Sequence, residues 1–150
     1  MGYLIDSNVL SELRKAKRVE QVAAWFRGVD PAELFTSVLV IAELRRGSSL
    51  LRRRDPESAS RLDAWISDLE TAFADRVLAV TAVVANRWAE LMVPNPIPVI
   101  DGLLAATALA HDLTLVTRNT KRRRPDGREA ARSVSTVPLT LLGGQVSPPL

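Results

Sequence analysis

The sequence contains no cysteine and a single histidine, and it has no long run of apolar residues. Without cysteine the chain can form neither a disulfide framework nor a thiolate metal site. No apolar run approaches the length that spans a membrane, and the N-terminus lacks the charged-then-apolar pattern of a signal peptide. We therefore expect a soluble, cytoplasmic protein that makes no membrane contact.

The composition is that of one globular domain with an uneven distribution of charge. The 150 residues are 47% hydrophobic, which is enough for a real core. The net charge is +3, but the segment from Lys121 onward holds six basic and two acidic residues, so residues 1–120 carry a net charge of −1. An attraction to nucleic acid that is inferred from the overall charge therefore applies to the C-terminal tail, which carries the excess of positive charge.

Short apolar runs alternate with segments of helical spacing along the chain. The runs at 3–5, 34–36, 77–80 and 113–117 predict strands. Helices are predicted between them, and their expected caps and stops are Ser7 or Asn8, Ser37, Gly47 and Thr81. This alternation predicts an α/β fold with a mainly parallel sheet.

Three acidic residues stand out by their position. Asp6 follows the first strand, Glu43 interrupts an otherwise apolar helix, and Asp101 begins an apolar helix after the proline-rich loop at 94–98. Ionised carboxylates are rarely buried without a partner cation or a metal, and Mg²⁺ prefers oxygen ligands of this kind. A metal bound here would lower the pKa of a bound water and stabilise charge on a phosphoryl group.

Each of the three acids also has a structural explanation, which the sequence leaves open. For Asp6 and Asp101 this explanation is that each simply starts a helix. Glu43 can pair with a neighbouring arginine, and the options are Arg45, Arg46 or an arginine of the run at 52–54.

A family resemblance favours the metal site. The strings YLIDSNVLSEL, TSVLVIAELRRG and PVIDGLLAATALAHDLTLVTRN resemble, in their order and spacing, the PIN-domain ribonucleases, and within them the VapC/FitB-type toxins of type II toxin–antitoxin systems. The resemblance covers residues 3 to about 121. It implies a PIN-like three-layer α/β/α fold with a short, mainly parallel sheet of four to five strands. It also implies a Mg²⁺- or Mn²⁺-dependent RNA endonuclease, for which tRNA and rRNA are candidate substrates.

The resemblance assigns roles to individual residues. Asp6, Glu43 and Asp101 match the metal-coordinating acids of the family, and Asn119 matches a fourth position that is Asp in many members. Asp6 and Asp101 would bind the metal directly, whereas Glu43 would bind it through water or orient the attacking water. Asn119 would position that water or a second ion. The lone His111 is expected to be a structural residue at a helix end, so nothing suggests a histidine-based ribonuclease.

The same resemblance implies partners. A toxin of this class would pair with a cognate antitoxin protein, form a homodimer through its helices and hold an antitoxin segment in a groove. Some apolar side chains are then expected at the surface, although a core position is the default for each of them. The candidates are Leu10, Leu13, Leu39, Leu44, Leu50 and Leu51.

The chain departs from the family after Lys121. The run from Arg122 to Arg124 stands where the family usually has an Asp and then a short last strand. We therefore divide the chain into a PIN domain at 1–121 and an atypical basic tail at 122–150, expected to be disordered. We hypothesise a frameshift at Lys121, because the codons allowed for 122–134 can spell the usual family ending in another frame. Encoding DNA without that string in any frame would contradict this origin.

Two other functions compete with the nuclease. The main alternative is a catalytically weak or inactive PIN-fold protein that only binds antitoxin or RNA. The altered tail is the reason for considering it. A phosphoaspartyl enzyme of the haloacid-dehalogenase type also has an acid between a strand and a helix. That class requires a second Asp two residues after the first, and Asn8 stands there instead.

Overall fold

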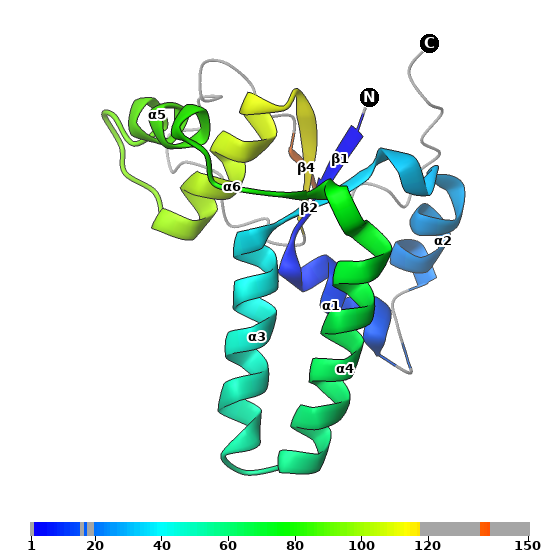
Figure 1. The fold of residues 1–150 in the computed structure, drawn as a ribbon. Helices are drawn as coiled ribbons and strands as arrows, with labels where there is room; N and C mark the ends of the chain where they lie inside the picture. The colour runs from blue at the N-terminus through cyan, green and yellow to red at the C-terminus, as the bar shows by residue number, and fades with distance from the viewer. Residues whose placement is uncertain (1, 16, 18–19, 118–135, 139–150) are drawn as a thin grey trace.

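Strands and helices alternate along the chain (Figure 1) in the computed structural model, which describes residues 2–15, 17, 20–117 and 136–138. The strands are β1 Gly2–Ile5, β2 Leu34–Ser37, β3 Val77–Leu78, β4 Leu113–Thr117 and β5 Thr136–Pro138. The α-helices are α1 Ser7–Arg14, α2 Glu20–Gly28, α3 Val38–Arg52, α4 Pro56–Phe73, α5 Ala82–Leu91 and α6 Val99–Ala110. Short 3₁₀ turns at Pro31–Glu33 and Ala74–Arg76 lead into β2 and β3.

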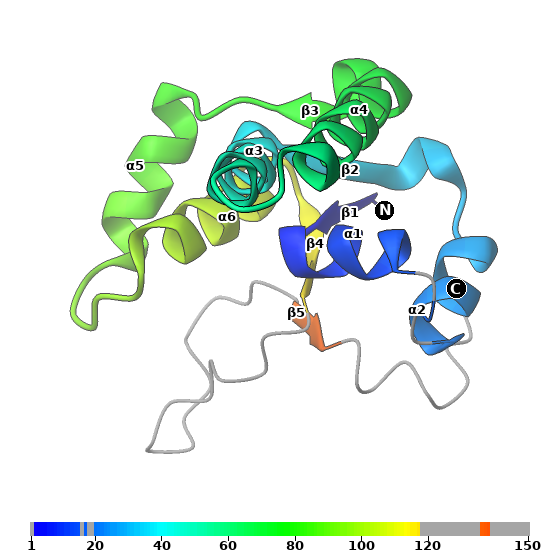
Figure 2. The same ribbon diagram turned by 90° about the horizontal axis from the view of Figure 1, so that it is seen from below.

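The strands form one sheet in the order β3-β2-β1-β4-β5, and all of the pairs are parallel. Helices lie on both sides of this sheet, with α1 and α2 on one side and α3, α4 and α6 on the other, and α5 packs against α6 (Figure 2). The expected three-layer α/β/α arrangement with a mainly parallel sheet is therefore confirmed.

The core is centred on the adjacent inner strands β1 and β4. Leu4 and Ile5 of β1 and Leu115 and Val116 of β4 are almost completely buried, since helices pack against both faces of the sheet. The apolar face of α4 belongs to the same core, because its large side chains either lie in the core or pack against it: Leu62, Trp65, Ile66, Leu69 and Phe73. The central strands are thus held firmly, and their carboxyl ends have defined positions.

The helix α3 is longer than the sequence predicts. Its cap is confirmed, because the Ser37 hydroxyl accepts a hydrogen bond from the Leu39 N–H. The predicted stop at Gly47 is wrong, since the helix continues to Arg52. Glycine inside a helix costs about 1 kcal/mol relative to alanine. Packing of α3 along α4 offsets that cost, and the buried Ser48 hydroxyl donates to the Ala59 carbonyl of α4 at 3.2 Å.

The six leucines considered for the surface divide into three groups. Leu10 and Leu44 are buried, which agrees with the default expectation of a core position. Leu50, by contrast, is 50% exposed. The remaining three are partly buried and pack against the core: Leu13, Leu39 and Leu51. The expectation of an exposed apolar surface thus holds for one of these side chains.

One part of the expected disordered tail is structured. Thr136–Pro138 forms β5 and pairs in parallel with β4, in the register Leu115↔Thr136 to Thr117↔Pro138. The expected loss of a last strand is therefore wrong, because an edge strand still satisfies the outer backbone groups of β4. The rest of the tail and the hypothesised frameshift lie outside the described residues. Within the described ranges, no helix is both long and apolar enough to cross a membrane.

Candidate active site

The site lies where the carboxyl ends of three strands meet. The register Ile5↔Val116 places the end of β1 beside the end of β4, and the Asp6 N–H extends this pairing by donating to the Val116 carbonyl at 3.1 Å. On the other side of β1, β2 ends at Ser37. Ligands of open α/β sheets bind in the crevice at this edge. Asp6 is therefore placed on the edge where chemistry is expected.

Asp6 is both a helix cap and a buried carboxylate. Its backbone is extended, and its side chain accepts a hydrogen bond from the Ser7 N–H at 2.7 Å, so Asp6 caps α1 rather than Ser7 or Asn8. The Thr117 hydroxyl donates to the second carboxylate oxygen, also at 2.7 Å. Asp6 is only 6% exposed, and no cation pairs with it within the described part of the chain. A cation beside it would offset the cost of burying its charge.

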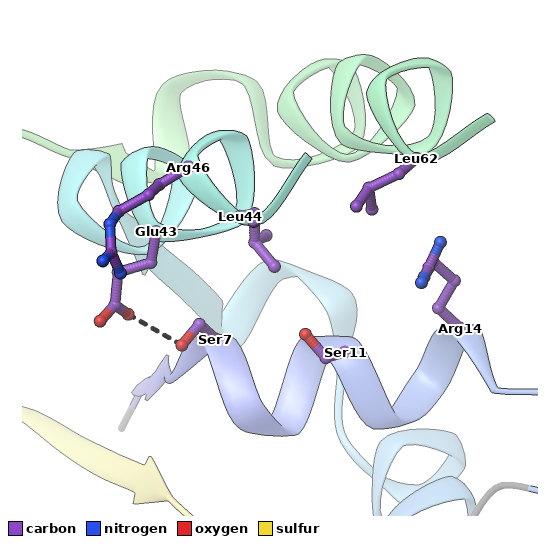
Figure 3. Close-up of a pocket in the computed structure, with 8 residues that line it drawn as sticks. Ser7, Ser11, Arg14, Glu43, Leu44, Arg46 and Leu62 are labelled. Carbon is purple, nitrogen blue, oxygen red and sulfur yellow. Dashed lines mark hydrogen bonds between the residues drawn. The ribbon is translucent and has the colours of Figure 1, made fainter. Parts of the chain in front are cut away.

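Ser7 connects Asp6 to Glu43. The Ser7 hydroxyl lies 2.8 Å from Glu43 Oε2, the hydrogen bond drawn as a dashed line in Figure 3. The same hydroxyl lies 3.3 Å from Asp6 Oδ1. A hydroxyl has a single proton to donate, so the shorter contact to Glu43 is the favoured bond. Two carboxylates that are 37 positions apart in the sequence are thus brought to one serine hydroxyl.

Glu43 does not use the arginine partners that the sequence offers. Arg45 instead contacts Asp63 and Glu70 of α4, the latter at 2.7 Å. No ion pair involves Glu43 within the described residues, and the side chain is exposed to solvent. Glu43 therefore remains accessible to a metal, a water molecule or a substrate.

Asp101 lies in the first turn of α6 and does not cap that helix. The cap position is Pro98, so the expectation that Asp101 caps this helix is wrong. A tight turn at 111–112 joins α6 to β4, so α6 runs back along β4 and its first turn faces the edge where β4 ends. A Cβ on Gly102 would lie 3.0 Å from the Trp88 ring, so glycine lets α5 pack closely against this turn. Asp101 is half-buried.

The structure brings together only part of the predicted ligand set. Asp6 and Glu43 are linked through Ser7, and the topology directs Asp101 to the same edge. In the described ranges, however, no three acidic or histidine side chains are grouped closely enough to hold a metal ion. Asn119 lies outside these ranges. Carboxylate and hydroxyl oxygens fit a hard cation such as Mg²⁺ or Mn²⁺, so the donors that are present suit the expected metal.

Sequence reasoning missed Thr117. Its hydroxyl is buried and bonded to Asp6 across 111 positions of the sequence. A polar residue at the end of an apolar strand is the signal that could have identified it. His111, by contrast, stands where the sequence predicts, as the C-cap of α6, and it is exposed.

A pocket adjoins the two linked carboxylates. It lies between α1 and the α3–α4 pair and has a volume of about 300 Å³. Figure 3 shows Ser7 and Glu43 at one end and Arg14 and Leu62 at the other. The other lining residues are Ser11, Leu44, Arg46 and Gly47.

The fold and the site define a class: a parallel α/β/α protein with linked carboxylates at the strand ends that suit a hard divalent cation. Comparison with known proteins narrows it. The family model for the PIN domain matches residues 3–128. Toxin FitB of Neisseria gonorrhoeae is 34% identical over 124 residues, which cover 78% of this chain and 87% of FitB. VapC ribonuclease Y4jK of Sinorhizobium fredii is 33% identical, with 78% of this chain and 86% of that protein covered.

The solved structures agree with the sequence comparison. The crystal structure of FitAcB from Neisseria gonorrhoeae has a TM-score of 0.71 and 31% sequence identity, and the match covers 79% of this chain and 88% of that chain. The chain therefore belongs to the PIN-domain family, and its relatives there are FitB- and VapC-type toxins. The family resemblance found in the sequence is confirmed.

Proposed function

We propose that the chain is a Mg²⁺- or Mn²⁺-dependent endoribonuclease and the toxin of a toxin–antitoxin pair. The observation that carries this proposal is the buried Asp6 carboxylate, linked through Ser7 to an accessible Glu43 at the carboxyl edge of the sheet. The names of the relatives, a toxin and a ribonuclease, support the same interpretation.

Asp6, Glu43 and Asp101 would hold the metal, which would activate a water and neutralise charge on the phosphoryl group. Asp6 is kept in one orientation by the Ser7 N–H and the Thr117 hydroxyl, so its carboxylate is preorganised. Glu43 is fixed by Ser7 yet exposed, and it would orient the attacking water.

In-line attack of such a water on an RNA phosphodiester would break the bond between phosphorus and the 3′ oxygen, leaving a 5′-phosphate and a 3′-hydroxyl. In this scheme Asn119 would position that water or a second ion.

The proposal includes the partners that the resemblance implies. The toxin would act in the cytoplasm as a homodimer and would be held inactive by a cognate antitoxin. An arginine of the antitoxin that reached Asp6 and Glu43 would compete with the metal for the same oxygens, since guanidinium groups bind carboxylates strongly. A complex in which these two carboxylates stay open would contradict that mode of inhibition.

Metal-dependent RNA cleavage tests the function directly. The full chain is titrated with Mn²⁺ or Mg²⁺ and assayed for RNA cleavage beside Asp6→Asn and Asp101→Asn. Asp112→Asn is the matched control, because Asp112 is exposed and has a φ of 52°, a conformation that Asn also tolerates. In the two site variants we expect cleavage to fall by more than the roughly 10- to 100-fold loss that follows removal of a partner of a metal ligand. Cleavage should persist in the control.

The main alternative, a PIN-fold protein that binds antitoxin or RNA without turnover, is favoured by one observation. Among the residues that the structure describes, the acids do not form a group of three that could hold a metal. A folded wild-type chain that binds RNA but shows no cleavage at any metal concentration would support this alternative and contradict the nuclease.

A further inference from the structure

The pocket beside the linked carboxylates is lined by two cationic side chains. Arg14 stands at the end of α1 and Arg46 on α3, and both are exposed (Figure 3). Ser7 and Ser11 lie one turn apart on α1, about 6 Å along the helix axis, and both hydroxyls belong to the pocket lining. The pocket thus begins at the residue that bridges the two carboxylates and continues along α1.

In the part of the chain that the structure describes, neither arginine forms an ion pair with an acidic residue. Within the described residues, Arg46 makes no ion pair and no side-chain hydrogen bond, and Arg14 has only its guanidinium 5.9 Å from the centre of the Trp65 ring. The neighbouring Arg45 and Arg52 differ, since both pair with Asp63. The pocket therefore holds two guanidinium groups whose donors remain available to a ligand.

We propose that this pocket binds a phosphate of the RNA backbone adjacent to the linkage that is cleaved. The inference rests on the proposed ribonuclease function and names the residues that bind the strand beside the reacting group. Guanidinium groups bind phosphate oxygens through two parallel hydrogen bonds, and serine hydroxyls donate to phosphate or to a ribose 2′-hydroxyl. Ser7 belongs to both sites, so a strand bound in the pocket enters the carboxylate site directly.

The lining favours a nucleic acid strand over a protein segment. Its two leucines, Leu44 and Leu62, are only 7% and 8% exposed, so they offer little apolar surface to a side chain of a partner. Two arginines, Arg14 and Arg46, stand against one acid, Glu43, so the lining carries a positive balance of charge that attracts a phosphate. An anionic backbone therefore fits the pocket better than an apolar peptide does.

RNA binding over a range of salt concentrations tests the proposal. A short fluorescent single-stranded RNA is titrated with the full chain in EDTA, where metal-dependent cleavage does not occur. For Arg14→Gln and Arg46→Gln we expect affinity to fall several-fold. The slope of log Kd against log salt should decrease by about 0.7 for each phosphate that the variant no longer neutralises. Arg46→Lys keeps the charge and should keep most of the slope.

Arg53→Gln is the matched control. It removes the same charge from the end of α3, where Arg53 is exposed and outside the pocket lining. Its slope should stay close to that of the wild type. Thermal unfolding of each variant checks that the fold is intact, and Arg46 provides the cleaner test because Arg14 also contacts Trp65.

A second measurement locates the phosphate. Single linkages of the RNA are replaced in turn by uncharged methylphosphonates, and their affinities are measured for the wild type and for Arg46→Gln. We expect replacement of one linkage next to the cleavage position to weaken binding to the wild type. The same replacement should have no further effect on the affinity of the variant, which is the signature of a direct contact in a double-mutant cycle. Equal effects on both proteins at every linkage would overturn the proposal.

The outcomes separate this inference from the proposed function. Pocket variants with the wild-type salt slope overturn the phosphate site even if the chain cleaves RNA. A chain that never cleaves RNA, but whose pocket variants have a reduced slope, overturns the nuclease and leaves the phosphate site standing. Unchanged RNA affinity together with a loss of antitoxin binding would assign the pocket to a protein partner, which also overturns the proposal.

Discussion

At the scale of single residues, Asp6 combines two roles that the sequence presents as alternatives. It caps α1 through the Ser7 N–H, and its burial at a strand end makes it a suitable metal ligand. The two roles support each other, because the positive end of the helix dipole stabilises the ionised carboxylate. The helix start therefore also orients the carboxylate that we propose as a metal ligand.

The bond from Thr117 to Asp6 yields a prediction at this scale. Thr117→Val removes the hydroxyl that donates to Asp6 Oδ2 and keeps the shape of the side chain. Loss of a hydrogen-bonding partner of a metal ligand lowers metal affinity about 10- to 100-fold. We expect that decrease for Mn²⁺, measured by calorimetric titration. Thr117→Ser retains the hydroxyl and should bind Mn²⁺ like the wild type, and equal losses in both variants would show that the hydroxyl is not the cause.

At the scale of elements, the α3–α4 pair positions Glu43. The two helices extend side by side from the sheet (Figure 1), and charged groups join them along their length. Arg45 contacts Asp63 and Glu70, and Arg52 also pairs with Asp63. These contacts hold the face of α3 that carries Arg45 against α4, so Glu43 is left to face Ser7.

The pKa of Asp63 makes this helix pair sensitive to acid. The Ser48 hydroxyl, followed by the guanidinium groups of Arg52 and Arg45, lowers the pKa of Asp63 below its usual 3.8. A carboxyl whose pKa is lower in the folded state stabilises the fold above its unfolded value, and that stabilisation disappears as the pH falls through the folded pKa. The affected range therefore lies at and below pH 3.8.

Asp63→Asn tests this dependence. We expect the variant to unfold at a lower temperature than the wild type at neutral pH, and the difference to shrink as the pH falls from 3.8 downward. Thermal unfolding followed by circular dichroism measures both midpoints at each pH. Asp68→Asn, an exposed change on the same helix, serves as the control. A constant gap between wild type and Asp63→Asn at every pH would contradict the assignment.

At the scale of the whole molecule, β5 closes one edge of the sheet. Its three residues pair with Leu115, Val116 and Thr117 of β4, the strand that carries the hydroxyl bonded to Asp6. The three residue pairs between β4 and β5 provide partners for the backbone groups on the outer side of β4. This matters because buried backbone groups without partners cost free energy. The short strand therefore supports both stability and the geometry at the strand end.

Two truncated chains test the role of β5. One ends after residue 135 and the other after residue 138, so they differ only by the strand Thr136–Pro138. We expect the shorter chain to have the lower thermal midpoint, because β4 loses its outer hydrogen bonds. Each bond contributes about 1 kcal/mol, so a decrease of several degrees is expected. Identical midpoints would show that β5 adds no stability.

Much of the fold was predictable because its signals are local. The strand at 113–117, the caps Ser37 and Thr81, and the apolar face of α4 all depend on residues a few positions apart, where apolar spacing and capping chemistry act directly. The sequence by itself also determined the α/β class and placed Asp6 and Asp101 close to the ends of elements that lead to one edge.

Only the tertiary structure decided which groups meet. Ser7 as the partner of Glu43, Thr117 as the partner of Asp6, and the continuation of α3 past Gly47 all depend on contacts between distant segments. Side-chain spacing within one helix or strand carries no information about such contacts. They follow from the order of the strands, which places β4 beside β1, and from the packing of α3 against α4.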